Sequence, residues 1–256
     1  MTPPVVILAF ALAGLVVGSF LNVCIHRLPR RESLLWPASH CPACNRPLAW
    51  YENVPIVSWL VLRGRCRTCR APIAGRYLLV ELVTGVVFAG GAAVYGVTPL
   101  AAVRLAFASA LIVLFMIDLR HQILPNAITL PGIAAGFAAS WFLPPGWVSS
   151  LIGIVAGGGI LLAIAGAYYR VRGQEGLGMG DVKMLAMIGA FLGWPLTILT
   201  LVLASCAGSL AGVSLMASGR GGLQAALPFG TFLALGALVA AVAGDGILAW
   251  YLGFYQ

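Results

Sequence analysis

The sequence predicts an all-α polytopic membrane protein with about eight transmembrane helices. Only 9% of its 256 residues are charged and 61% are hydrophobic, whereas an average soluble domain carries roughly 25% charged residues. So few charges cannot cover the surface of a water-soluble globule of this length. The composition therefore excludes a soluble enzyme, a disordered protein and a coiled coil, and it leaves a bundle of membrane-spanning helices.

The predicted helices follow from eight apolar runs, since a span needs roughly 20 apolar residues. The sixth run is short because it stops at Gly193-Trp194-Pro195, and a kinked or re-entrant segment is the alternative there. No basic residue precedes the first run, so we expect it to remain as a span and not to be cleaved as a signal peptide. The runs cover residues 5–25, 77–96, 98–117, 127–143, 148–169, 182–194, 196–217 and 227–252.

Glycine is unusually frequent in these runs and predicts close helix packing. The chain contains 32 glycines among its 256 residues, nearly twice the usual share of about 7%. Small residues allow transmembrane helices to approach closely. The Gly-x-x-x-Gly spacing favours a tightly packed bundle, and it occurs at Gly14/Gly18, Gly132/Gly136, Gly153/Gly157, Gly189/Gly193 and Gly208/Gly212.

The basic residues predict how the helices are oriented. Nine arginines lie in the loop 26–76, and with the N-terminus outside, fourteen of the fifteen lysines and arginines fall in cytoplasmic loops. Membrane proteins carry such an excess of cations on the cytoplasmic side, so the net charge of +8 indicates membrane topology and not nucleic-acid binding. The chain then divides into a first transmembrane helix (1–25), a cytoplasmic domain (26–76) and a seven-helix membrane domain (77–256).

Two cysteine pairs in the first loop predict a metal site. Cys41 and Cys44 are followed by Cys66 and Cys69, and two such pairs can supply four thiolates to a tetrahedral structural Zn²⁺. A disulfide pair and a redox relay are the alternatives, although disulfides are disfavoured in the cytosol. Metal binding would stabilise a loop with too small an apolar core to fold alone. The remaining cysteines lie in apolar runs and are expected as core residues: Cys24 and Cys206.

Two aspartates are predicted to lie at the same edge of the membrane. Asp118 ends the third run and Asp181 opens the sixth, and these runs cross in opposite directions, so both residues fall at the cytoplasmic boundary. Two carboxyl groups in one partly dry site share a proton, as in the aspartic proteases, where one activates water and the other polarises a peptide carbonyl. The alternative is that Asp118 pairs with Arg120 or Arg104 and Asp181 caps its helix.

The other polar residues of the runs receive structural interpretations. Glu81 lies one turn into the second span, where we expect an ion pair with Arg76 or Lys183. Asp245 lies toward the outer end of the last span and is expected as an interfacial residue. The three histidines show no ligand spacing and are expected in loops: His26, His40 and His121.

Together these residues resemble the prepilin peptidases, also called type IV leader peptidases. The resemblance is carried, in order, by Gly18-Ser-Phe-Leu-Asn22-Val-Cys-Ile-His-Arg27-Leu-Pro29, the two Cys-x-x-Cys pairs, Gly75-Arg76-Tyr77-Leu-Leu-Val-Glu81, Asp118 followed by Pro125-Asn126, and Gly178-Met-Gly180-Asp181-Val-Lys183. These motifs run along nearly the whole chain. Only Gly-x-Gly-Asp is shared with presenilin-like intramembrane proteases.

The resemblance implies an aspartic endopeptidase of the bacterial inner membrane. It would cut the basic leader from type IV prepilins or type II secretion pseudopilins after a glycine, with Asp118 and Asp181 as the catalytic pair and Gly178, Gly180 and Lys183 in the active-site motif. The family often also methylates the new N-terminus with S-adenosylmethionine, and the cysteine loop is associated with that form. No residue is assigned to the methyl donor, and the arginine-rich loop is expected against anionic lipid headgroups.

Two other functions are compatible with the same residues. A transporter or proton channel would use the two aspartates as a relay, although a relay favours acids staggered across the membrane. A zinc-stabilised membrane adaptor would need no chemistry at either aspartate. Replacing Asp118 or Asp181 by asparagine separates these functions, because only a peptidase then loses leader cleavage.

Overall fold

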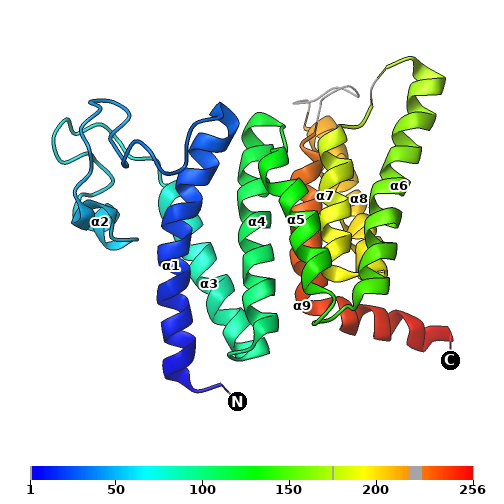
Figure 1. Ribbon diagram of the computed structural model, residues 1–256. Coiled ribbons are helices and arrows are strands. Elements are labelled where there is room, and N and C mark those ends of the chain that lie inside the picture. Colours follow the sequence, from blue (N-terminus) through cyan, green and yellow to red (C-terminus); the bar gives the residue numbers. More distant parts are fainter. Residues whose placement is uncertain (1, 175, 219–226, 256) are drawn as a thin grey trace. The chain divides into compact units, whose positions relative to one another are not determined.

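The structure of the chain is a computed structural model that describes residues 2–174, 176–218 and 227–255. The described residues form helices and no β-strand, apart from two isolated bridges, so the predicted all-α fold is confirmed (Figure 1). Most of the loop 218–226, including Arg220, lies outside the described residues. The α-helices are α1 (Pro4–Arg27), α2 (Val57–Val61), α3 (Arg76–Tyr95), α4 (Pro99–His121), α5 (Asn126–Ala139), α6 (Trp147–Arg172), α7 (Met179–Leu192), α8 (Trp194–Ala217) and α9 (Phe229–Leu252), and the 3-10 helices are η1 (Leu28–Arg30), η2 (Trp50–Asn53) and η3 (Gly253–Tyr255).

Six of these helices are long and apolar enough to cross a membrane: α1, α3, α4, α6, α8 and α9. The predicted count of eight spans is not confirmed, because α5 and α7 have only 14 residues each. A helix of that length measures about 21 Å, less than the roughly 30 Å of the hydrocarbon core. Between α7 and α8 the chain breaks at Gly193, whose φ of 77° no helix accommodates.

The chain forms two compact units, Met1–Val113 and Leu114–Gln256. In the first unit α1 packs against α3, and glycines make the contact close. A Cβ on Gly14 would lie 2.7 Å from Cβ of Phe88, and one on Gly18 would lie 2.7 Å from Cα of Glu81. The Gly14/Gly18 pair thus lies at a helix–helix contact of the kind that its spacing predicts.

In the second unit α7 is the central helix and packs against α5, α6, α8 and α9. From Met184 onward its side chains are apolar on all faces, and Met184, Leu185, Met187 and Ile188 are completely buried. A helix that is hydrophobic all round is buried inside its protein. The short sixth run is therefore explained by burial among neighbouring helices.

The closest packing lies between α6 and α7, where two glycine stripes face each other. A Cβ on Gly153 would lie 2.6 Å from the carbonyl oxygen of Gly189, and a Cβ on Gly189 would overlap the Gly153 backbone. Ser150 adds a hydrogen bond of 2.8 Å from its hydroxyl to the carbonyl oxygen of Ala190. No side chain fits between the two backbones, so both positions require glycine.

We expect Gly153→Ala to destabilise the protein, because the added methyl group forces α6 away from α7. Overpacking of this kind costs about 1–3 kcal/mol, and thermal unfolding in detergent measures it. Gly159→Ala in the same helix is the matched control, since nothing lies within 4 Å of a Cβ at that position. The control should be neutral or stabilising by up to about 1 kcal/mol, and an equal effect of both changes would contradict this packing.

Candidate active site and metal centre

Asp118 is buried in the last turn of α4, with 4% of its surface exposed. Its Oδ2 accepts two hydrogen bonds from Thr231, one from the backbone N–H at 2.7 Å and one from the hydroxyl at 3.1 Å. Thr231 lies in the first turn of α9, where backbone N–H groups have no partner within the helix. The start of α9 therefore fixes the orientation of the Asp118 carboxyl group.

Gly230 makes this contact possible. A Cβ at that position would lie 3.0 Å from Oδ2 of Asp118 and 2.9 Å from Cδ1 of Leu124, so a side chain there would push against the carboxyl group. Neither Gly230 nor Thr231 was among the residues expected at the site. The only sequence feature near these two residues is Pro228-Phe229-Gly230-Thr231 at the start of the last apolar run. Because this segment looks like an ordinary helix start, it gives no sign of a contact with Asp118.

Asp181 lies in the first turn of α7, as expected, and is half-buried. Its backbone N–H donates to the carbonyl oxygen of Gly178 at 3.1 Å, and a Cβ on Gly178 would lie 3.3 Å from its Oδ2. Glycine at position 178 thus leaves room for the carboxyl group to fold over the start of the helix. A carboxylate in a first helical turn is also favoured by the helix dipole.

The two aspartates belong to one site. The carboxyl groups of Asp118 and Asp181 are close enough for their charges to interact. Leu124 links the two motifs, because a Cβ on Gly180 would lie 3.0 Å from Cβ of Leu124, and Leu124 also lies against Gly230. The end of α4 and the start of α7, whose aspartates are 63 positions apart in the chain, therefore lie together with the start of α9.

Lys183 points toward the start of α5. Its Nζ donates a 3.0 Å hydrogen bond to Oδ1 of Asn126, which follows Pro125 in the segment after Asp118. This bond connects the two sequence motifs a second time, in the first turns of α7. Lys183 thus ties α7 to α5.

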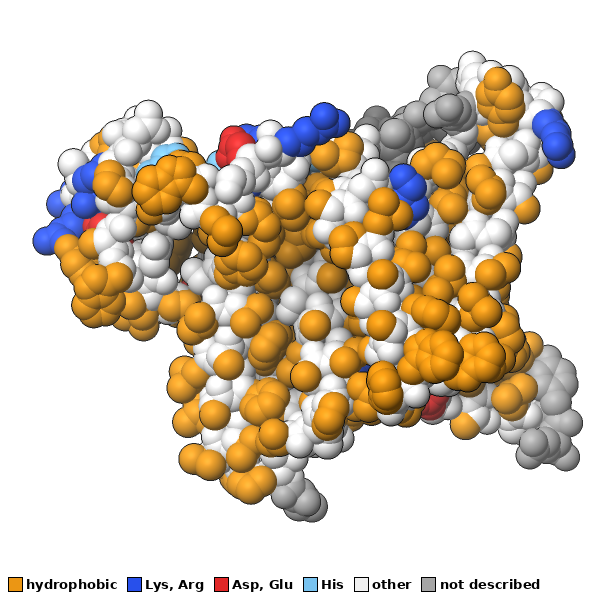
Figure 2. All heavy atoms as spheres, viewed as in Figure 1, with side chains coloured by type: hydrophobic (Ala, Val, Ile, Leu, Met, Phe, Trp, Pro, Cys, Tyr) orange, Lys and Arg blue, Asp and Glu red, His pale blue; other side chains and the backbone are white. Residues whose placement is uncertain are grey.

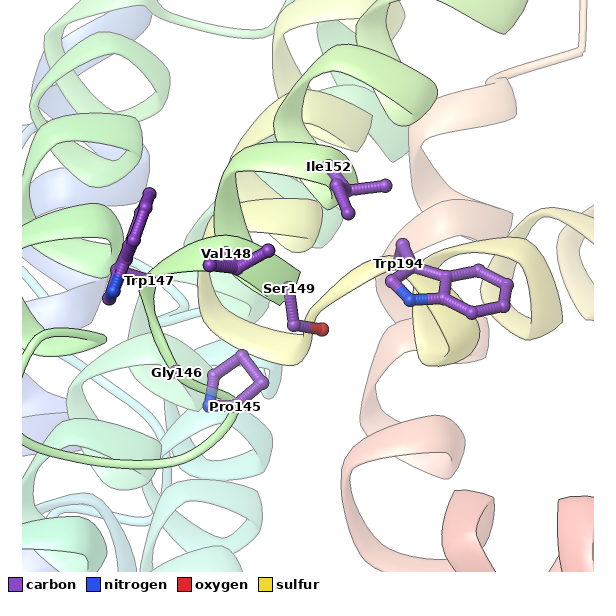
Figure 3. A pocket seen from close by; sticks show the side chains of 7 residues that line it. All are labelled: Pro145, Gly146, Trp147, Val148, Ser149, Ile152 and Trp194. Atoms are coloured by element: carbon purple, nitrogen blue, oxygen red, sulfur yellow. The ribbon is translucent and has the colours of Figure 1, made fainter.

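A cavity of about 370 Å³ lies between the start of α6 and the start of α8, lined by Pro145, Gly146, Trp147, Val148, Ser149, Ile152 and Trp194 (Figure 3). Asp181 opens α7, whereas Trp194 follows the end of α7. The length of the helix, about 21 Å, therefore separates the cavity from the aspartates. The cavity does not belong to the candidate active site.

Glu81 has a different partner from the expected ones. In the first unit its Oε2 accepts a 2.8 Å hydrogen bond from the backbone N–H of Ile56, in place of an ion pair with Arg76. Glu81 is buried. It therefore anchors the cysteine loop to α3, which sequence spacing does not reveal because the partner is a backbone group 25 positions away.

The four predicted cysteine ligands are gathered in one cluster. The sulfur atoms of Cys41, Cys44, Cys66 and Cys69 all lie within 4.8 Å of one another and can hold a metal ion. The Sγ atoms of Cys41 and Cys69 are 3.8 Å apart, too far for a disulfide. That separation matches the edge of a tetrahedron, roughly 3.8 Å, built on Zn–S bonds of about 2.3 Å. All described cysteines are free thiols.

The two Cys-x-x-Cys pairs have the same local fold. In the first, the Asn45 N–H donates to the Cys41 carbonyl oxygen at 2.8 Å, and in the second, the Arg70 N–H donates to the Cys66 carbonyl oxygen at 3.0 Å. Asn45 and Arg70 both have positive φ angles, 55° and 60°. We call these two turns the first and second knuckle, for residues 40–47 and 65–72. Each presents its sulfur atoms to the cluster.

Electrostatics favour a thiolate at Cys66 in the second knuckle, whereas burial and the neighbouring cysteine sulfurs raise the pKa of the Cys69 thiol to about 11. The backbone N–H groups of Cys69 and Thr68 lower the pKa of the Cys66 thiol to about 6. Next to the first knuckle, the Ala49 N–H and the Arg46 guanidinium hold the pKa of the Glu52 carboxyl below its usual value. Arg46 Nη2 lies 2.6 Å from Oε1 and 2.8 Å from Oε2 of Glu52. The loop thus has little apolar core but two electrostatic supports.

Comparison with protein families matches most of the chain. Residues 12–95 match the bacterial peptidase A24 N-terminal domain, and residues 105–213 match the type IV leader peptidase family. The first match includes the four cysteines and Glu81, and the second includes Asp118 and Asp181. Thr231 lies beyond both matched ranges.

Several curated relatives are similar over most of their length. Proteins named prepilin leader peptidase/N-methyltransferase are 39% identical in Burkholderia pseudomallei, over 90% of this chain and 83% of the relative, and 39% identical in Aeromonas hydrophila, over 94% and 92%. The protein of that name in Pseudomonas aeruginosa is 36% identical over 98% of this chain and 95% of its own length. No solved structure matches the chain significantly.

Proposed function

Because this chain belongs to the type IV leader peptidase family, we propose that it is an aspartic endopeptidase of the bacterial inner membrane. Its substrates are type IV prepilins or pseudopilins, and it cuts after the glycine that ends their basic leader. The observation that carries this proposal is the meeting of Asp118 and Asp181 from two separate helices at one site. The name of the relatives adds a second activity, N-methylation of the new N-terminus.

In the proposed reaction the two carboxyl groups act on one water molecule. Because both cannot easily be ionised side by side, they hold one proton between them. The ionised group takes a proton from the attacking water, and the protonated group donates a hydrogen bond to the scissile carbonyl oxygen. Thr231 occupies Oδ2 of Asp118 with two hydrogen bonds, which leaves Oδ1 for the water.

The location of the pair suits such a substrate. A prepilin has an apolar helix in the bilayer and a basic leader on the cytoplasmic side, so its scissile bond lies at the membrane boundary. Asp118 is in the last turn of α4 and Asp181 is in the first turn of α7. With the N-terminus outside, as the distribution of arginines predicts, both face the cytoplasmic edge.

We assign a structural Zn²⁺ to Cys41, Cys44, Cys66 and Cys69. The spacing of their sulfur atoms and the thiolate character of Cys66 fit a closed four-thiolate site. The methyl donor of the second activity is S-adenosylmethionine, which supplies an electrophilic methyl group. We also propose the division into a first helix (1–25), a zinc domain (26–76) and a membrane domain (77–256).

The experiment that tests the function is incubation of the purified protein with a prepilin and isotopically labelled S-adenosylmethionine. Mass measurement of the product should show an N-terminus that begins after the leader glycine and carries one labelled methyl group. An uncut prepilin would refute the peptidase, and cut but unlabelled pilin would refute only the methyltransferase.

A proton relay is the second candidate function. It is less well supported, since the two aspartates share one site and one neighbouring residue, Leu124, whereas a relay distributes its acids across the membrane. Two results together would favour the relay: the wild-type protein leaves prepilin uncut, and it carries a proton flux in liposomes that disappears in Asp181→Asn.

A further inference from the structure

A short apolar helix in the cysteine loop, α2, is held beside the first turns of α3. α2 starts directly after Ile56, whose N–H donates a 2.8 Å hydrogen bond to Oε2 of Glu81. Glu81 is the sixth residue of α3, so it lies about 7–8 Å along the helix from its first residue. Since α3 is a membrane-spanning helix, this bond holds the start of α2 beside the first turns of a span.

The backbone at Ile56 is strained in order to reach this position. Ile56 has a φ of 62° and a ψ of −54°, and the Val57 N–H donates to the Pro55 carbonyl oxygen at 2.5 Å. A γ-turn with positive φ is rare, above all at a β-branched residue. Such strain persists only where surrounding contacts impose it. The Glu81 carboxylate supplies one such contact, so the turn that precedes α2 is built into the unit.

The outer side of α2 carries large apolar side chains that are exposed among the described residues of the first unit. Val57, Leu60 and Val61 are 55%, 56% and 75% exposed, and Trp50 is 82% exposed. Trp50 opens η2, which packs against α2. Figure 2 shows hydrophobic side chains gathered over the position that α2 has in Figure 1. A contiguous exposed patch of this kind marks an interaction site. We call α2 and Trp50 together the interfacial helix.

Beside the interfacial helix lies a basic cavity. It has a volume of about 450 Å³ and is lined by Val61, Leu62, Arg63, Arg65 and Arg70, and we call it the arginine cavity. Three of these five residues are arginines, and guanidinium groups are the side-chain groups best suited to bind phosphate. The loop 26–76 holds nine arginines and only two glutamates, and Glu52 is already paired with Arg46. The cavity therefore attracts anions.

We propose that the interfacial helix lies in the headgroup region of the bilayer, and that the arginine cavity binds the phosphate of an anionic phospholipid. The two parts have the chemistry of interfacial anchors, in which apolar side chains enter the acyl boundary and neighbouring arginines bind headgroups. Tryptophan is also the residue that membrane–water interfaces favour. The partner is thus the lipid surface next to α3, and the zinc domain is held against the membrane. This inference does not depend on the peptidase activity.

The depth of the interfacial helix is tested by photocrosslinking in the full-length protein. With benzoylphenylalanine at position 60 in nanodiscs, irradiation should attach a phospholipid to the peptide that contains this position. The matched control places the same residue at position 68, which is exposed on the second knuckle and lies outside the patch. A lipid adduct at position 60 and not at 68 supports the proposal. Equal adducts, or none at position 60, overturn it.

The headgroup specificity is tested by hydrogen exchange of residues 57–70. Exchange should be about fivefold or more slower in nanodiscs with phosphatidylglycerol than in phosphatidylcholine alone, the factor expected for one arginine contact with an anionic surface. The R63Q/R65Q/R70Q variant should lose this difference, and R170Q/R172Q, which removes charge from the end of α6, should retain it. Exchange is also measured in phosphatidylcholine nanodiscs with added inorganic phosphate, which distinguishes binding of a free anion from binding of a lipid headgroup.

Each outcome decides the proposal. If both variants lose the difference in exchange between the two kinds of nanodisc, the effect is one of general charge. If inorganic phosphate alone slows exchange, the arginine cavity is a site for a soluble anion. Either result overturns the proposal. If the triple variant loses its metal, Val61→Asp replaces it. The added charge should abolish the adduct at position 60 while all three arginines remain, and an unchanged adduct overturns the proposal.

Discussion

Replacing Asp118 or Asp181 by asparagine should abolish leader cleavage while the protein stays folded. Each carboxyl group is needed for a proton transfer that its amide cannot perform, and the loss of an acid–base group costs on the order of 10²–10⁴-fold in rate. Asparagine at position 118 retains an oxygen that accepts hydrogen bonds from Thr231, so the start of α9 keeps its place. Cleavage rates in detergent, with thermal unfolding measured in parallel, check the prediction.

Two further variants provide the controls for this experiment. Asp245→Asn removes a carboxyl group that lies exposed in α9, about 21 Å along that helix from Thr231, and activity should remain. Thr231→Val removes the hydroxyl donor but keeps the backbone donor, so a partial loss is expected. Full cleavage by either asparagine variant at position 118 or 181 would reject the catalytic pair.

Removing a cysteine ligand should release the metal and unfold the loop. The wild-type protein is expected to contain one zinc ion per chain by elemental analysis, and Cys41→Ser or Cys66→Ser should contain none. Both thiols are buried, and apparent zinc binding by comparable peptides contributes on the order of 10 kcal/mol. Without it the segment 39–73 has little core of its own, so limited proteolysis should cut this segment first.

Cys206→Ser is the matched control for the metal experiment. Cys206 is not the core residue that the sequence predicted but an exposed thiol in α8. It belongs to the second unit, so this variant should keep both its zinc and its protease resistance. A wild-type protein without metal, or metal retained by Cys66→Ser, would contradict the four-thiolate site. Because the aspartate pair lies in the second unit, residual cleavage by the cysteine variants would show that the two centres are separable.

The sequence predicted where the helices lie, but it did not show whether an apolar helix is surrounded by lipid or by other helices of the protein. The runs that became α5 and α7 are as apolar as the six longer helices, yet in α7 Met184 and Leu185 are buried by neighbouring helices. Hydrophobic composition reports only that a side chain avoids water. The length of a run was the better guide to its surroundings, because the sixth run stops at Gly193-Trp194-Pro195 and α7 has only 14 residues. The Gly-x-x-x-Gly pairs were more informative, since Gly153 and Gly189 meet across one interface.

The candidate site was predicted where side chains carry charge and missed where backbone groups take part. Asp118 and Asp181 could be found because a carboxyl group in an apolar run is costly, and whether they are catalytic remains a prediction. Thr231 donates partly through its backbone N–H, and Glu81 accepts from the backbone of Ile56. Every residue except proline has such an N–H, so nothing in the sequence distinguishes these partners.

The dependence of Asp118 on Thr231 has a consequence for the order in which the enzyme becomes active. Chains are synthesised from the N-terminus, and α9 is the last α-helix among the described residues to leave the ribosome. A nascent chain that has already inserted α4 and α7 therefore contains both acids without the donors that orient one of them. Under the proposed mechanism, the newly made protein therefore becomes active only after α9 has been inserted and Thr231 has bound Asp118.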